Sequence, residues 1–402
     1  MSFSARIKKH LDDIRASYWF VPTVLVLSAI LLAFVSLIVD SHPQLGKFRP
    51  DWMSDVVSAE GARAIVSVIA QSMIGVAGVM FSITMLAVSF ASGQFGPRLI
   101  GNFMRDRGNQ WTLGILISTF TFALLTLRAI ENPHDEIAAF VPHFSIILTM
   151  LLALISVFVM IYHVHHVPET ISASNIVAGL GRRLTRDVEN LLESDPVEVT
   201  IYASEFVDVN MRTAGYIHNV AQDRLSAIAK EQGWVIELLE APGEFMHPHR
   251  SVLRVWGATE PLDEEMASRL RGAVALGLAK TEKQNIIFVT EQLVEIVARA
   301  MSPGVNDPFT AISCMQWMEA GLSPFVQQDR QLNVYQVEGV RAKPISFEKL
   351  LSRSLGDCRT YVQDDALTRD TFLQVLERLS DLATKTNRAP IEALAQQVRS
   401  AA

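Results

Sequence analysis

The stretch from Ala64 to Ala91 constrains this chain more than any other part of the sequence. Its 28 residues include no Asp, Glu, Lys, Arg, His or Pro. As a continuous helix it would be about 42 Å long, whereas the hydrocarbon core of a bilayer is about 30 Å thick. The sequence therefore predicts a helix that crosses a membrane and either tilts within it or extends beyond it.

Small and polar residues follow one face of this predicted helix. They recur at helical spacing, while the other faces carry Val, Ile, Met, Leu and Phe. These residues are Ser67, Gln71, Gly75, Gly78, Ser82 and Ser89. Lipid offers their polar atoms no partner, so the stripe should face protein or water. Two interpretations follow: close packing of helices, which Gly and Ser permit, or the lining of a polar pathway.

Three further apolar runs predict a transmembrane domain over residues 1–168. The four expected spans cover about residues 18–39, 64–91, 112–130 and 143–163. Lys and Arg gather in residues 1–16 and 93–110, whereas the loop at 131–141 has none. By the positive-inside rule, both termini and the large C-terminal domain lie in the cytoplasm.

No carboxylate, Lys or Arg lies in the apolar cores of the four spans. Ion-coupled pumps usually place such a group near the middle of the membrane, so this pattern argues against an active transporter. A passive channel or a membrane anchor remains compatible with it.

A cluster of possible metal ligands follows the fourth span: His163, His165, His166 and Glu169. On a helix, however, His165 points away from His163 and His166. A His-rich membrane interface is the favoured interpretation, and we predict no metal and no cofactor.

Residues 165–402 have the composition of an acidic soluble domain, with 24 Lys and Arg against 32 Asp and Glu. A net charge of −8 argues against nucleic acid as a partner, because phosphate binding needs an excess of basic residues. The two cysteines, Cys314 and Cys358, have no metal-type spacing.

The expected fold is therefore a four-helix membrane domain followed by an α+β domain. A helical connector at 169–197 leads to a small β-rich module at 198–260, and residues 261–402 are mainly helical. Strands are predicted at 198–210, 215–220, 234–239 and 251–257, and a later pair at 334–340 and 343–346. Helices are predicted at 221–232, 285–301, from 308 onward, and at 347–364, 368–385 and 388–400. The β-rich module resembles a barrel-sandwich domain of the biotinyl and lipoyl kind, without a lysine to carry a prosthetic group.

The turn from Ser302 to Pro308 is the best candidate for a cytoplasmic site. Asp307 is expected to cap the helix that begins at Pro308, which leaves Asn306 free to meet a ligand. The candidate residues are Arg98, Ser302, Asn306, Asp307 and Thr310. A purely structural corner between two helices is the competing interpretation, because turns of this kind use Pro, Gly, Asn and Asp anyway.

Several phrases resemble a family of bacterial predicted membrane proteins catalogued as domain of unknown function 2254. The phrases lie at residues 92–98, 215–218, 242–245 and, most specifically, 298–311. The resemblance covers nearly the whole chain, although Met301 stands where the family more often has Leu. It implies this architecture and a bacterial inner-membrane location, and it implies no chemistry.

Two functions fit these features. The first is an oligomeric passive channel or conduit for an ion or small ligand, regulated by the cytoplasmic domain. Because one four-span subunit has too few helices for an obvious pore, this function needs a homo-oligomer. The second is a membrane-anchored ligand-binding or regulatory module without transport activity. An enzyme is disfavoured, because His218, Glu244, His247, His249 and Asp307 match no catalytic spacing.

Overall fold

A computed structural model describes residues 17–42, 58–96, 106–131, 140–194, 199–282, 284–334 and 337–400. The chain divides into two compact units, a helical bundle within Ser4–Ser172 and an α/β unit over Ala173–Ala402.

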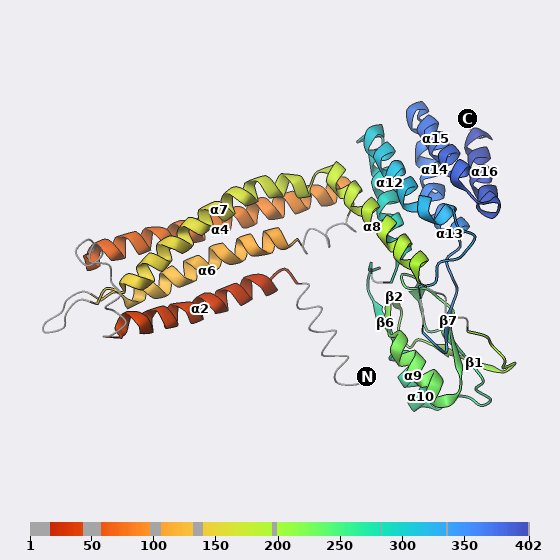
Figure 1. Ribbon diagram of the computed structural model, residues 1–402, viewed down its shortest axis with the longest axis horizontal. Coiled ribbons are helices and arrows are strands. Elements are labelled where there is room, and N and C mark those ends of the chain that lie inside the picture. The colour runs from red at the N-terminus through yellow and green to blue at the C-terminus, as the bar shows by residue number, and fades with distance from the viewer. Residues whose placement is uncertain are drawn as a thin grey trace. The chain divides into compact units, whose positions relative to one another are not determined.

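The helical bundle consists of four long apolar helices (Figure 1). They are α2 (Phe20–Ser41), α4 (Ala59–Phe95), α6 (Arg107–Ala129) and α7 (His143–Thr170). Each is long and apolar enough to cross a membrane, so the four predicted spans are confirmed as candidates by length and composition. Helix α4 is longer than predicted, since Ser58 caps it by accepting a hydrogen bond from the amide of Gly61.

Helix α6, not α4, is the most enclosed helix of the bundle. In the most apolar 18-residue window, 39% of the α6 residues are buried, against 17% of the α4 residues. Because a lipid-facing polar stripe is costly, the sequence predicts α4 as the most protein-enclosed of the four helices, and within the chain that prediction is wrong. The reason is that α6 packs against α2, α4 and α7. Gly114 permits this close packing, because a Cβ atom there would lie 2.6 Å from Leu25 Cδ1 and 3.1 Å from Pro22 Cα.

The α/β unit begins with α8 (Ala173–Glu193), an amphipathic helix that packs on α12 (Pro308–Val326). Its buried residues recur at helical spacing and are Val177, Leu180, Gly181, Leu184, Val188 and Leu192. Gly181 lies against Trp317, and Gly321 of α12 lies against Leu184. Small residues therefore let the two helices approach closely on both sides of their contact.

Two small sheets form the β-rich part of this unit. The first has the order β1-β5-β3-β7, with strands Phe206–Asn210, Ser251–Trp256, Val235–Leu238 and Val340–Ala342. The second has the order β4-β2-β6, with strands Phe245–Met246, Gly215–Val220 and Val274–Gly277. All pairs are antiparallel except β3 with β7.

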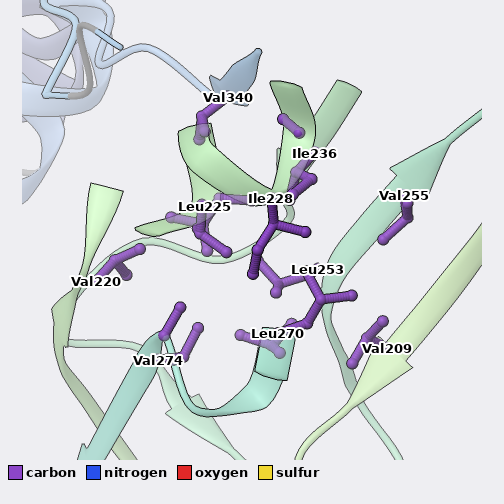
Figure 2. Close-up of a cluster of buried hydrophobic side chains, with 14 of the residues drawn as sticks. Val209, Val220, Leu225, Ile228, Ile236, Leu253, Val255, Leu270, Val274 and Val340 are labelled. Carbon is purple, nitrogen blue, oxygen red and sulfur yellow. The ribbon is translucent and has the colours of Figure 1, made fainter. Parts of the chain in front are cut away.

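Two helices, α9 (Gln222–Gln232) and α10 (Glu264–Arg271), complete the core of this part. Figure 2 shows side chains of α9, α10 and both sheets gathered in one cluster. Because Leu270, Val274 and Val340 belong to this cluster, the packed module extends beyond residue 260.

The strand predictions near residues 198 and 340 need correction. The strand predicted at 198–210 begins only at Phe206, and residues 199–205 of the described chain are not extended in a sheet. Among the described residues, which leave out 335 and 336, the pair predicted at 334–340 and 343–346 is not formed: β7 instead pairs in parallel with β3, and Leu332 forms an isolated bridge with Ile345. A parallel partner about a hundred residues away in sequence leaves no local signal.

The rest of the unit is helical, as the sequence predicts. Its elements are α11 (Ile286–Ala300), α12, α13 (Phe347–Leu351), η3 (Ser352–Gly356), α14 (Asp357–Val362), α15 (Ala366–Leu382) and α16 (Lys385–Ser400). The helix predicted at 347–364 is interrupted by η3, a five-residue π-helical turn. Such π-helical turns are rare in proteins, and those that do occur are often found at functional sites.

Candidate functional site

The small and polar residues predicted to share one face of α4 lie on the outside of the bundle within this chain. We call them the α4 stripe: Ser67, Gln71, Gly75, Gly78, Ser82 and Ser89. Gln71, Gly75, Gly78, Ser82 and Ser89 are exposed, and Ser67 is half-buried. A Cβ atom at Gly75 or Gly78 would meet nothing within 4 Å among the described residues. The face of α4 that packs inward instead carries Ala62, Val66, Ala70, Met73, Ala77 and Met80.

The buried polar side chains of the bundle gather mainly on α6 and α7. Three lie on α6, seven residues apart: Thr112, Thr119 and Thr126. Three lie on α7, also seven residues apart: Thr149, Ser156 and His163. Each is at most 2% exposed. We call these six residues the polar ladder.

One hydrogen bond fixes how the two rows face each other. Thr119 Oγ1 and Ser156 Oγ lie 3.0 Å apart, and either can donate. The helices run antiparallel, because the segments that join them pair antiparallel at Glu131 and Phe140. Seven residues make nearly two helical turns, so the same register places Thr112 level with His163 and Thr126 level with Thr149. The ladder thus has three levels.

Apolar packing agrees with this register. Met160 packs on the cluster that contains Leu116, one turn from the central level in each helix. On the other side of that level, Leu152 packs on the cluster that contains Phe122. Apolar layers therefore separate the polar levels.

Several buried polar atoms of the ladder have no hydrogen-bond partner in the described part of the chain. They are Thr112 Oγ1, Thr126 Oγ1 and His163 Nδ1. The neighbouring Asn109 Oδ1, one turn before Thr112, shares this property. By contrast, Thr149 Oγ1 donates to the carbonyl of Ser145 over 2.8 Å. Buried polar groups in proteins are nearly always satisfied, so these atoms mark a region of the bundle that favours further polar contacts.

Each end of the ladder is next to an ionisable group. At one end, Asp40 of α2 accepts hydrogen bonds from the amides of Phe144 and Ser145, both at 2.9 Å, and from Ser145 Oγ at 2.7 Å. At the other end, Asp106 Oδ2 lies 2.9 Å from His166 Nε2 and caps α6 through the amide of Asn109.

The three histidines of α7 have different partners. His163 Nε2 lies 3.4 Å from Thr84 Oγ1, His166 meets Asp106, and the exposed His165 pairs with Glu169 at 3.2 Å. In the ranges that the structure describes, no three His, Cys, Asp or Glu side chains are grouped to hold a metal.

The corner at Ser302–Pro308 is a well-bonded turn. Asp307 caps α12 by accepting hydrogen bonds from the amide of Thr310 at 3.1 Å and from its hydroxyl at 2.5 Å. Ser302 Oγ donates to the carbonyl of Arg299. Asn306 is exposed and has a φ of 48°, a left-handed conformation that Asn tolerates better than most residues. Arg98, also a candidate residue of this site, lies outside the described residues.

The residues weighed for catalysis also have separate partners. His218 Nε2 contacts the carbonyl of Ala279, and the rings of His247 and His249 lie 6.2 Å apart. Asp307 is occupied as a helix cap. These contacts do not bring the three histidines and Asp307 together as one set.

The seven-residue spacing of the polar ladder is visible in the sequence, although we did not predict it as a site. Ser and Thr occur often in membrane helices, where they bond to their own backbone. Only the contact between Thr119 and Ser156 shows that the two rows share one interface.

Comparisons with known proteins identify relatives but no activity. A family model described as predicted membrane protein (DUF2254) matches residues 15–378. The chain is 28% identical over 324 residues to uncharacterized protein Mb1321c of Mycobacterium bovis and to uncharacterized protein Rv1290c of Mycobacterium tuberculosis. The match covers 78% of this chain and 61% of each relative, so the chain spans about three fifths of their length. No solved structure matches it.

Proposed function

This chain belongs to the family of predicted membrane proteins (DUF2254), and we propose that each subunit is a passive conduit for protons. The proposed path follows the polar ladder inside the bundle. The observation that supports it is the pair of facing, heptad-spaced rows of buried polar side chains, with ionisable groups at both ends. In this proposal the protein lies in the bacterial inner membrane, both termini are cytoplasmic, and the α/β unit regulates the conduit.

Hydroxyl groups suit proton transfer because each one both donates and accepts a hydrogen bond. Thr119 and Ser156 can exchange these roles, since either oxygen can be the donor. His163 adds a ring with two nitrogens, and in the neutral ring one of them donates a hydrogen bond while the other accepts one. Asp40 and the pair of Asp106 and His166 then serve as the points of entry and exit.

The apolar layers favour protons over metal cations. Successive levels of the ladder are about 10.5 Å apart along the helix axis. Leu116 and Phe122 lie between them, and a dehydrated cation would find no ligand there. Hydrophobic constrictions block ions by excluding water, whereas a proton needs only a short-lived chain of waters.

The path is proposed to be passive. Among the residues that the structure describes, every buried polar side chain of the bundle is uncharged or is a histidine. A pump usually holds a carboxylate or a basic side chain near the middle of the membrane.

We also propose that the α4 stripe packs against a second copy of the chain. The Gln71 amide donates to Ser67 Oγ over 2.8 Å, which leaves its remaining polar groups on the outside of the bundle. Lipid cannot satisfy them, whereas a facing helix can, and the glycines permit a close approach.

A membrane-anchored binding or regulatory module without transport is the second candidate. In that case the ladder would serve only to fix the register of α6 against α7, as buried polar residues do in coiled coils. Thr112 Oγ1 and Thr126 Oγ1 have no hydrogen-bond partner among the described residues, which favours the conduit, because a pure register device would have satisfied pairs.

The proposal is tested with purified protein in liposomes. A K⁺ gradient with valinomycin sets the voltage, and a dye inside reports pH. We expect a voltage-driven proton flux, with no comparable K⁺ flux when valinomycin is left out. Ser82→Ala on the exposed stripe should conduct normally. A flux no greater than that of empty liposomes would rule out the conduit, and loss of flux in Ser82→Ala would move the path to α4.

A further inference from the structure

A cavity of about 150 Å³ lies in the α/β unit, and its lining includes no residue of the polar ladder. Its walls come from the segment after β3, the start of α11, the residues after β7, α13 and the π-helical turn η3. Elements far apart in sequence therefore meet around one partly open cavity. Cavities that join several elements and carry a few polar groups are the usual places for small ligands.

The lining of the cavity has more basic than acidic side chains, whereas the surrounding domain is acidic. Four cationic side chains face three carboxylates there. The cations are Lys280, Lys343, Lys349 and Arg353, and the carboxylates are Glu240, Glu244 and Glu291. Residues 165–402 as a whole have a net charge of −8, so a local excess of positive charge stands out.

Two of the three carboxylates are already neutralised. Glu291, at 9% exposed, accepts hydrogen bonds from Lys280 Nζ at 2.7 and 3.0 Å and from Arg353 at 2.7 Å. Glu240 pairs with Arg250 at 2.6 Å. The remaining carboxylate is Glu244, which is exposed. These pairs leave the cavity with little capacity to bind a cation.

Two lysines of the lining have no carboxylate partner among the described residues. Lys343 follows β7, and Lys349 lies in α13; both are exposed. Lysine ammonium groups bind phosphate well as compact point charges. The side chains that remain available are thus predominantly donors to an anion.

Irregular backbone surrounds the same cavity. Arg353 lies in the π-helical turn η3, and Gln284 has a φ of 55°. The Gln284 side chain holds its position by bonding both the amide and the carbonyl of Val220, at 3.0 and 3.2 Å. Uncommon backbone conformations cost free energy, and they cluster at active sites and ligand-binding sites.

We infer that this cavity binds a small, multiply charged anion with a phosphate group, through Lys343 and Lys349. Behind it, Lys280 and Arg353 are paired with Glu291 and Asp357, so Lys343 and Lys349 supply the positive charge that faces the ligand. This inference does not depend on the conduit, since the cavity lies wholly in the α/β unit.

The test uses the full chain in detergent and measures its thermal midpoint with inorganic phosphate or pyrophosphate against chloride at equal ionic strength. A ligand that binds only the folded protein raises the midpoint with concentration. We expect such a rise for the natural sequence. The double variant Lys343→Gln/Lys349→Gln should bind at least tenfold more weakly. Lys385→Gln, an exposed lysine on α16, is the matched control and should bind normally.

A further arm adds a short-chain phosphatidic acid to identify the source of the phosphate group. If phosphatidic acid competes with pyrophosphate, the site binds a lipid headgroup. If it does not compete, the site binds a soluble anion. Both results support the anion site. The inference fails if phosphate and chloride act alike, or if the double variant responds like Lys385→Gln. Neither result bears on proton flux.

Discussion

Thr119 Oγ1 of α6 and Ser156 Oγ of α7 lie 3.0 Å apart, with both side chains buried. This single contact sets the register of two antiparallel spans. Because buried polar residues recur every seven positions on both helices, the register aligns two further levels, at Thr112 with His163 and at Thr126 with Thr149. The proposed proton conduit depends on this alignment.

Asp40 supports α7 from another helix. The first turn of α7 has no side-chain cap of its own, and Asp40 accepts hydrogen bonds from the amides of Phe144 and Ser145. Asp40→Ala should therefore lower the free energy of unfolding by about 1–2 kcal/mol. Ser41→Ala, whose exposed hydroxyl bonds only its own helix, should change it by less than about 0.5 kcal/mol. Denaturation in detergent measures both, and equal effects would contradict the capping role.

Two glycines of α8 should respond in opposite directions. A Cβ atom at Gly181 would lie 2.6 Å from Trp317 Cβ, so Gly181→Ala should destabilise the protein by about 1–3 kcal/mol. At Gly179 a Cβ atom would meet nothing within 4 Å in the part of the chain that the structure describes, and Gly179→Ala should stabilise the helix by about 0.5–1 kcal/mol. Thermal unfolding of the two variants checks the contact of α8 with α12. A stable Gly181→Ala variant would show that the helices lie farther apart.

The corner before α12 should prove sensitive at two neighbouring positions for different reasons. Asp307→Ala removes a cap and should cost about 1 kcal/mol. Asn306→Ala should also destabilise, by roughly 1 kcal/mol, because Ala is strained at a φ of 48°. Asn306→Gly is the control that relieves the strain and should be nearly neutral. Equal stability of Asn306→Ala and Asn306→Gly would show that residue 306 does not adopt the left-handed conformation.

Both cysteines should be protected from alkylation. Cys314 and Cys358 are fully buried, and burial raises the pKa of each thiol well above its ordinary value. The reactive thiolate is then scarce at any pH below the raised pKa, and it forms only as the pH rises through that value. At about pH 8, close to the ordinary thiol pKa, iodoacetamide should label the folded protein far more slowly than the protein in denaturant. Mass spectrometry measures the rates, and rapid labelling of the folded chain would contradict this burial.

Much of the architecture could be predicted from the sequence. The four spans follow from long apolar runs, and the cap at Asp307 follows from its position before Pro308; the structure has both. These features depend on residues adjacent in sequence, or spaced along one helix. Local patterns of this kind are readable without tertiary information.

The features that could not be predicted depend on distant partners. β7 pairs in parallel with β3, and no local pattern indicates that. The outward direction of the α4 stripe depends on which face of α4 meets α6, and the alanines and methionines of that inner face resemble any other apolar face. The sequence suggests a path along Gly78 and Ser82, whereas the proposed path runs past Thr119 and Ser156. Only the packing of the helices shows which hydroxyl groups are buried and which are exposed.

The most direct test of the conduit compares proton flux with stability in one variant. Thr119→Val together with Ser156→Ala removes both hydroxyls of the central level with little change in shape. Replacing both partners of a buried hydrogen bond by apolar groups is nearly neutral for folding, so the thermal midpoint should barely change. Ser28→Ala, an exposed hydroxyl of α2, is the matched control.

The account predicts that the double variant loses at least tenfold of the voltage-driven proton flux in liposomes, while Ser28→Ala keeps the flux of the natural sequence. A stable double variant that conducts as well as Ser28→Ala would contradict the account and would leave the polar ladder as a device that sets helix register.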